Sequence, residues 1–309
     1  PHTGLLRPQR FERAEITAQE GLPIGSTLDW VTLDFEEEIV VPDDAIMDWD
    51  AAAQDFITAT EKLVLDEEAA IADLEAAQAA IEDGPALVEE AQAALAEAQT
   101  ALDELPDDAS EEEVAEAETA VADAEAAVAD AEAAITAAEE SIPDLEAAVE
   151  AAGVKEFYTS KIKSVVYYPE ELWSDVTFHD GSPITLADFL YGWILSLDIG
   201  KPESAIFDQS QASNAAAILA NFKGFRILSE NPLTVEAYYD SYQTDAELNI
   251  GTFWPSFNYG EGPWHLMTLG ALADEGGSVA FSAAKADELS TDTSTVEWLS
   301  FVGGPGLEI

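Results

Sequence analysis

Three aromatic side chains in one stretch rich in glycine and proline are the residues of this chain best suited to contact a ligand. Trp254, Tyr259 and Trp264 lie close together in the sequence. Such rings offer large, rigid surfaces that stack on a sugar ring or a peptide side chain. The same rings could instead fill the core beneath an ordered loop. We take these three as candidate ligand-binding residues, with core packing as the alternative.

Residues for catalysis or metal binding form no recognisable pattern. The histidines are His2, His179 and His265, and neither His-x-x-x-His nor Gly-x-Ser-x-Gly occurs. Phosphate-binding glycine motifs and calcium-loop spacings are also absent from the sequence. Carboxylates are so numerous that a pair of them carries no information. We expect no enzyme, no cofactor and no metal site, and a glycosidase with two carboxylates is the alternative.

The charge excludes one class of partner. The chain has 64 Asp and Glu residues against 11 Lys and Arg residues, a formal net charge of −53. Nucleic acids and anionic membrane surfaces are therefore excluded, because phosphate attraction needs basic side chains. Adaptation to high salt is one hypothesis for this surface, since salt screens repulsion between like charges. An ordinary acidic surface is the other.

The sequence also bears on the compartment. It contains no cysteine, so it forms no disulfide, and no run of about 18 apolar residues predicts a membrane helix. It begins at Pro1 without a signal-like segment. We interpret it as a piece of a mature or larger protein whose export signal or lipid anchor lies elsewhere.

The most informative local pattern runs from Phe178 to Trp193. Asp180-Gly181 is a turn dipeptide, and Pro183 favours an extended segment after it. Thr185 occupies a helix N-cap position with Asp188 three residues later, as in a capping box. The following helix should present one apolar face, formed by Leu186, Phe189, Leu190 and Trp193. We interpret Asp180, Gly181, Pro183, Thr185 and Asp188 as scaffold rather than ligand contacts.

This run resembles the signature of extracellular solute-binding proteins of peptide-type ABC importers, solute-binding family 5. Residues 225–239, predicted as strand, turn and strand, resemble a hairpin of the same family. The resemblance implies an α/β, periplasmic-binding-protein-like (type II) lobe, here incomplete. It also implies a non-enzymatic receptor that passes a small peptide, or another small solute such as a sugar or chelated metal, to a permease in the membrane.

Residues 61–153 differ sharply from the rest, because they are rich in alanine and glutamate and lack tryptophan. Large apolar residues recur every seven positions in the second half, with a smaller residue three positions after most of them. This heptad pattern predicts a coiled coil. The repeating residues are Val114, Val121, Val128, Ile135, Ile142 and Val149.

The first half of this region continues the pattern less regularly. Its predicted seam contains Ile71, Leu74, Ile81, Val88, Leu95 and Leu102, with Gln78, Gln92 and Gln99 as interruptions. Pro106 followed by a Ser110-x-x-Glu113 capping box predicts the tip of an antiparallel hairpin. We expect Pro85 and Pro143 to kink or break the helices, and a reversal at Gly84 would give three helices instead.

These inferences define three parts. Residues 1–60 form the first part of the α/β lobe, with strands near 28–35 and 38–42 and a helix beginning near Asp50. Residues 61–153 form an inserted antiparallel coiled-coil hairpin, and 154–309 form the remainder of the lobe. The protein is expected to be extracellular, periplasmic or anchored at the cell surface. The alternative function is a cell-surface structural or interaction protein whose hairpin binds a protein partner.

Overall fold

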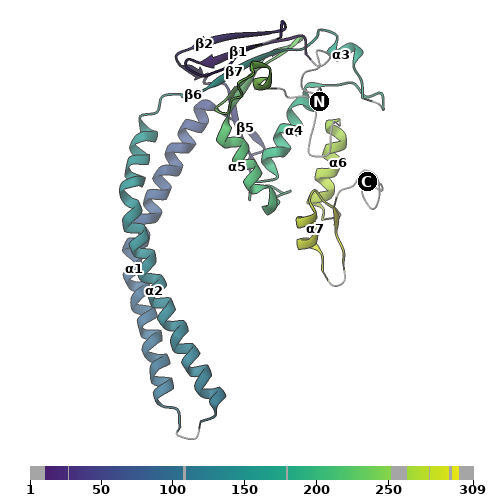
Figure 1. Cartoon of the computed structure of the whole chain (residues 1–309). Helices are drawn as coiled ribbons and strands as arrows, with labels where there is room; N and C mark the ends of the chain where they lie inside the picture. The colour runs from purple at the N-terminus through teal and green to yellow at the C-terminus, as the bar shows by residue number, and fades with distance from the viewer. Residues whose placement is uncertain are drawn as a thin grey trace. The chain divides into compact units, whose positions relative to one another are not determined.

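The protein divides into an α/β unit and a helical unit. The computed structural model describes residues 11–26, 28–106, 109–178, 180–251, 263–277, 279–291 and 294–298. The α/β unit comprises residues 1–62 and 157–309, and the helical unit comprises Leu63–Glu156. Each unit is a compact body (Figure 1).

A seven-stranded mixed sheet forms the centre of the α/β unit. The strand order is β2-β1-β7-β9-β8-β4-β5, with β1 and β2 parallel and the other neighbours antiparallel. The strands are β1 (Arg13–Gln19), β2 (Val31–Glu36), β4 (Ile46–Asp50), β5 (Asp55–Thr58), β7 (Ile162–Tyr167), β8 (Phe222–Glu230) and β9 (Leu233–Tyr239). Two smaller sheets pair β3 (Ile39–Val41) with β6 (Tyr158–Ser160) and β10 (Val279–Ala280) with β11 (Glu297–Trp298).

Segments from both sides of the helical unit build this one sheet. β1, β2, β4 and β5 precede the long helices in sequence, whereas β7, β8 and β9 follow them. The chain leaves the sheet after β5 and re-enters it at β7, after β6 has paired with β3 in a separate two-stranded sheet. The flanking segments are therefore parts of one α/β body.

The helix that follows the turn motif packs on the sheet. The shorter helices are α3 (Leu172–Asp175), α4 (Leu186–Asp198), α5 (Ala212–Asn221), α6 (Trp264–Glu275) and α7 (Ala283–Leu289), with 3₁₀ turns at Gln209–Gln211 and Ala246–Asn249. Phe189 of α4 joins the main core with Val235 and Phe225 of the sheet, and Trp193 packs against this core. Each such side chain stabilises the fold by about 1.5–3 kcal/mol. The opposite face of α4, through Leu195, packs against Met267 of α6.

The predicted helix near Asp50 is wrong. Residues 46–58 form the antiparallel pair β4 and β5. The Asp50 carboxylate accepts hydrogen bonds from the backbone N–H groups of Ala52 and Ala53, at 2.9 and 2.8 Å, and Gln54 takes a left-handed φ of 55°. This tight turn reverses the chain, so pairing within the sheet overrides the helical propensity of the alanines.

The helical unit contains two long helices, most of α1 (Ala59–Asp103) and α2 (Glu111–Gly153), that pack against each other (Figure 1). They are antiparallel, because Gly84 lies against Ile135 while Gly153 lies near Glu67. A Cβ at Gly84 would collide with the Ile135 side chain. The predicted capping box begins α2: Ser110 N–H donates to Glu113 at 2.8 Å and Glu113 N–H donates to Ser110 Oγ at 3.2 Å.

The two helices alternate large and small residues in a complementary register. Continuing the Gly84–Ile135 pairing in steps of seven places Ala91 opposite Val128 and Ala98 opposite Val121. The other layer of the seam reverses the sizes and pairs Leu95 of α1 with Ala124 of α2. Large residues of each helix thus face small residues of the other, which lets the axes approach closely.

Two details of the predicted hairpin differ in the structure. Neither Pro85 nor Pro143 breaks its helix, and the continuous α1 also rules out the three-helix alternative with a reversal at Gly84. Glycine before Pro85 has no Cβ to clash with the proline ring, and the ring itself is exposed. The predicted seam residues Leu74, Ile81, Val88, Leu95 and Leu102 are half-buried as expected. The other layer of the seam lies one residue before the prediction: Ile71 is 38% exposed, and alanines replace Gln78, Gln92 and Gln99 in the seam.

Candidate functional site

The predicted turn precedes α4 in the structure. Gly181 has a φ of 89°, a left-handed conformation that glycine adopts without strain. The Asp180 carboxylate accepts hydrogen bonds from Ser182 N–H at 2.9 Å and Ser182 Oγ at 2.7 Å. Pro183 pairs with Thr177 through an isolated β-bridge, which closes the turn. His179 lies outside the described residues.

Asp188 connects two helices. Its Oδ2 atom accepts hydrogen bonds from Thr185 N–H at 2.7 Å and Thr185 Oγ1 at 2.8 Å, which forms the predicted capping box of α4. Its Oδ1 atom accepts from the backbone N–H of Trp264, the first residue of α6, at 2.7 Å. Only 1% of Asp188 is exposed. The carboxylate therefore fixes the N-terminal end of α6 beside that of α4.

Of the three candidate ligand-binding aromatics, the structure describes Trp264 alone. Trp254 and Tyr259 lie outside the described residues. Trp264 is 39% exposed, and its ring meets His265 edge-on at 5.9 Å between centroids. His265 Nε2 lies 3.8 Å from Asp180 Oδ2. The structure thus places Trp264 and its neighbour beside the turn motif, and Trp264 lines neither the hollow between α4 and α6 nor the hollow at 239–251.

α4 and α6 run parallel to each other. Asp188 contacts Trp264 at one end, and Tyr191 hydrogen-bonds with Thr268 about one turn further along both helices. Asp198 and Glu275, the last residues of the two helices, line one common hollow. The helices are therefore joined at their N-terminal ends and enclose a space towards their C-terminal ends.

This space, the α4–α6 hollow, has a volume of 440 Å³. Its walls come from four separate segments: the β4–β5 turn at 51–54, α4, the loop at 203–206 and α6. Ile194, Leu195, Ile206 and Ala271 supply apolar surface, and Leu272 is 58% exposed at the lining. The volume falls within the roughly 300–1,000 Å³ typical of small-molecule sites, which are also largely apolar.

The acidic groups of the hollow differ in their partners. Asp198 is already engaged, since Oδ1 accepts from Trp49 Nε1 at 2.9 Å and Oδ2 accepts from Ser204 Oγ at 2.7 Å. The carboxylates of Glu203 and Glu275 form no hydrogen bond or ion pair with any part of the chain that the structure describes. Two carboxylates therefore remain available at the rim.

Tyr191 contributes a hydroxyl group to the same lining. Burial raises the pKa of Tyr191 above its ordinary value, the Asp198 carboxylate raises it further, and the hydrogen bond with Thr268 acts in the opposite direction. The phenol therefore stays protonated at neutral pH and can serve as a hydrogen-bonding group.

A buried ion pair supports the outer wall of the hollow. Lys285 of α7 donates its ammonium group to Asp274 of α6, and Asp274 Oδ2 accepts from the backbone N–H of Phe281 at 2.8 Å. Burial raises the pKa of Asp274, whereas Lys285 opposes this change. These bonds hold the C-terminal half of α6 against β10 and α7.

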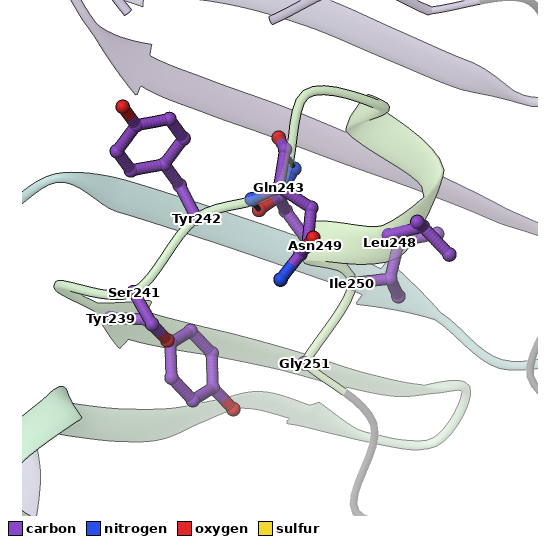
Figure 2. A pocket seen from close by; sticks show the side chains of 8 residues that line it. All are labelled: Tyr239, Ser241, Tyr242, Gln243, Leu248, Asn249, Ile250 and Gly251. Carbon is purple, nitrogen blue, oxygen red and sulfur yellow. Dashed lines mark hydrogen bonds between the residues drawn. The ribbon is translucent and has the colours of Figure 1, made fainter.

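A second hollow is formed by one short stretch of chain, residues 239–251, and has a volume of 330 Å³ (Figure 2). The side-chain amide of Asn249 forms hydrogen bonds within this stretch. It accepts from Gln243 N–H at 2.7 Å and donates to the carbonyls of Gln243 and Asp245 at 2.9 and 3.0 Å. Figure 2 shows Tyr242 and Leu248 on opposite sides of this loop. The hollow lies where a loop closes on itself, and the Asn249 amide holds that loop together.

Sequence reasoning missed the α4–α6 hollow. Its residues come from segments spread between positions 51 and 275, so no local motif predicts it. One signal was present, because Thr268, Ala271 and Glu275 recur at helical spacing on one face of α6.

No group of three or more His, Cys, Asp or Glu side chains among the described residues is arranged to hold a metal ion. None of the described helices has the length and apolar character needed to cross a membrane.

Comparisons with protein-family models and with curated proteins find no match for this chain.

Proposed function

We propose that the chain is the solute-binding receptor of a peptide-type ABC importer and that it captures a small peptide in the α4–α6 hollow. It acts outside the cytoplasmic membrane and presents its ligand to a membrane permease. The proposal rests on the resemblance of residues 178–193 to that family, together with the position of this run in the fold.

One observation carries the proposal. The helix of the resembling run, α4, is itself a wall of the hollow, and its buried Asp188 fixes the opposite wall, α6. Four segments converge there and combine apolar side chains with polar and acidic ones, and convergence of several segments on one hollow is typical of a site for a small molecule. The second hollow lacks this convergence, because one loop forms all of it.

The test is thermal unfolding of the full chain, followed by tryptophan fluorescence, with acetylated and amidated Ala-X-Ala tripeptides. A peptide that binds only the folded state should raise the melting temperature with concentration, by about 2.7 kcal/mol in stability at 100 times Kd. Ala271→Trp should fill the hollow and remove this rise. Ala217→Trp, on the exposed surface of α5, should retain it.

Circular dichroism of both variants establishes that they fold. The proposal fails if no tripeptide stabilises the wild-type chain. It also fails if a folded Ala271→Trp variant responds as the wild type does.

A second function, in which the helical unit binds a protein partner, is favoured by one observation. Leu87 is 58% exposed and Leu65 is 41% exposed on the outside of the helix pair. Sedimentation of the full chain should then show assembly that depends on concentration and disappears in Leu87→Gln. A monomer at all concentrations would leave the receptor function as the proposal.

A further inference from the structure

We infer that the α4–α6 hollow selects ligands with a positively charged group on an aliphatic chain, such as a lysine side chain. This inference rests on the proposed function and specifies its ligand class. Three features of the hollow support it: the direction of its two helices, the charges at its rim and the apolar surface beneath them.

Both helices direct their C-terminal ends to the same side of the hollow. The contacts of Asp188 with Trp264 and of Tyr191 with Thr268 establish that α4 and α6 are parallel. The helices have 13 and 12 residues, and both end at the hollow, in Asp198 and Glu275. Each C-terminal end carries a partial negative charge of about half an elementary charge. The two ends therefore favour a cation at this side.

The charged side chains of the lining add further negative charge to that of the helix ends. No lining residue is basic, and Glu203 and Glu275 have no partner within the described chain. The nearest lysine along the chain, Lys201, already donates its ammonium group to Asp48 at 2.6 Å and to the Trp49 carbonyl. No cation in the described residues therefore neutralises the two rim carboxylates.

The remaining lining defines the other part of the ligand. Ile194, Ile206 and Ala271 form an aliphatic surface, and Tyr191 adds the side of a ring. A lysine side chain buries its methylene groups on apolar surface while its ammonium group reaches a polar rim. An acidic side chain would meet two carboxylates and two helix C-terminal ends, which repel it.

The net charge of the whole chain also favours a cationic ligand. A net charge of −53 attracts cations at a distance, and this attraction raises the rate of encounter at low ionic strength. Affinity for a cationic ligand should therefore decrease as salt is added, whereas affinity for a neutral analogue should change little.

The experiment is calorimetric titration of the full chain with three probes that differ in one side chain: acetylated and amidated Ala-Lys-Ala, Ala-Gln-Ala and Ala-Glu-Ala. The lysine peptide should bind at least about tenfold more tightly than the glutamate peptide. Glu203→Gln and Glu275→Gln should each weaken the lysine peptide by about two- to fivefold, as for exposed ion pairs. Neither change should weaken the glutamine peptide.

The matched control is Glu20→Gln, an exposed acid in the turn after β1, which should leave all three affinities unchanged. Equal binding of the three peptides would overturn the charge preference and leave solute capture standing. No binding of any peptide would overturn the proposed function itself. Loss of lysine selectivity in Glu20→Gln as well would show that net charge, rather than the hollow, sets the preference, and would overturn the inference.

Discussion

The α/β unit and the helical unit use opposite means to reach a stable structure. The α/β unit carries most of the basic residues and engages them in pairs such as Lys201 with Asp48 and Lys285 with Asp274. The helical unit, residues 63–156, has Lys155 as its only basic residue and no aromatic residue. It depends on a narrow seam in which small residues face large ones.

This difference indicates which unit offers side chains suited to binding a small ligand. The α/β unit has varied side chains, buried polar groups and converging segments, which together form hollows with specific chemistry. The helical unit has a uniform acidic surface and few distinct groups, which suits a spacer or a docking rod. The difference in composition also lets the two units be followed separately in experiments. Tryptophan fluorescence reports on the α/β unit alone, and far-ultraviolet dichroism reports mainly on the long helices.

The largest effect is expected from Lys285→Met. Asp274 is 3% exposed, so losing its ammonium partner leaves a buried carboxylate without a counter-charge. This should cost about 3–5 kcal/mol in the free energy of unfolding. Urea unfolding followed by tryptophan fluorescence measures it. Lys223→Met, which removes a more exposed pair with Asp240 at 3.3 Å, should cost about 1 kcal/mol or less.

Asp188→Ala should rank next. It removes the acceptor of three hydrogen bonds and leaves the Trp264 N–H without its partner, at a cost of about 2–3 kcal/mol. The loss should appear in tryptophan fluorescence and leave the dichroism of the long helices nearly intact. A cost equal to that of Thr185→Val, which removes one of these bonds, would contradict the role of Asp188 as the link between α4 and α6.

Gly84→Leu should affect the other unit. The new side chain must enter the space of Ile135, and such overpacking costs about 1–3 kcal/mol. The midpoint of the helical transition at 222 nm should fall, with no change in tryptophan fluorescence. Gln78→Leu, on an exposed position of the same helix, serves as the control and should leave the midpoint in place.

Added salt should change the melting temperatures only slightly, and by different amounts in the two units. Raising NaCl from 0.1 to 1 M shortens the screening length from about 10 to 3 Å, which weakens repulsion between carboxylates. The melting temperature of the helical unit should rise by a few degrees and that of the α/β unit by less. An equal rise would mean that the pairing of basic residues in the α/β unit does not reduce its repulsion.

Patterns within a few residues predicted much of the fold. The hairpin at 225–239, the capping boxes at Thr185 and Ser110 and the long heptad helices all follow from local spacing. Asp50 shows the limit, because alanine-rich residues after it form a turn that only pairing of β4 with β5 specifies.

Tertiary contacts determine the features that local patterns did not predict, namely the seam of α1 and the α4–α6 hollow. The seam of α1 could use either of two adjacent positions, and the fit of Gly84 against Ile135 selects the alanine-lined one over the glutamines. Two walls of the α4–α6 hollow are joined by the buried carboxylate of Asp188, which accepts a hydrogen bond from a backbone N–H 76 positions away. Sequence reasoning placed Asp188 correctly as a cap, yet it gave no sign of this second bond.

Thiol protection tests the central claim most directly, because the chain has no cysteine and a single introduced thiol reports one place. Leu272→Cys places a thiol in the α4–α6 hollow, and Leu248→Cys, at a residue of similar exposure, places one in the second hollow. Saturating acetylated and amidated Ala-Lys-Ala should slow alkylation of the first by iodoacetamide at least about tenfold and leave the second unchanged. Protection of the second thiol alone, or of neither, would contradict capture between α4 and α6.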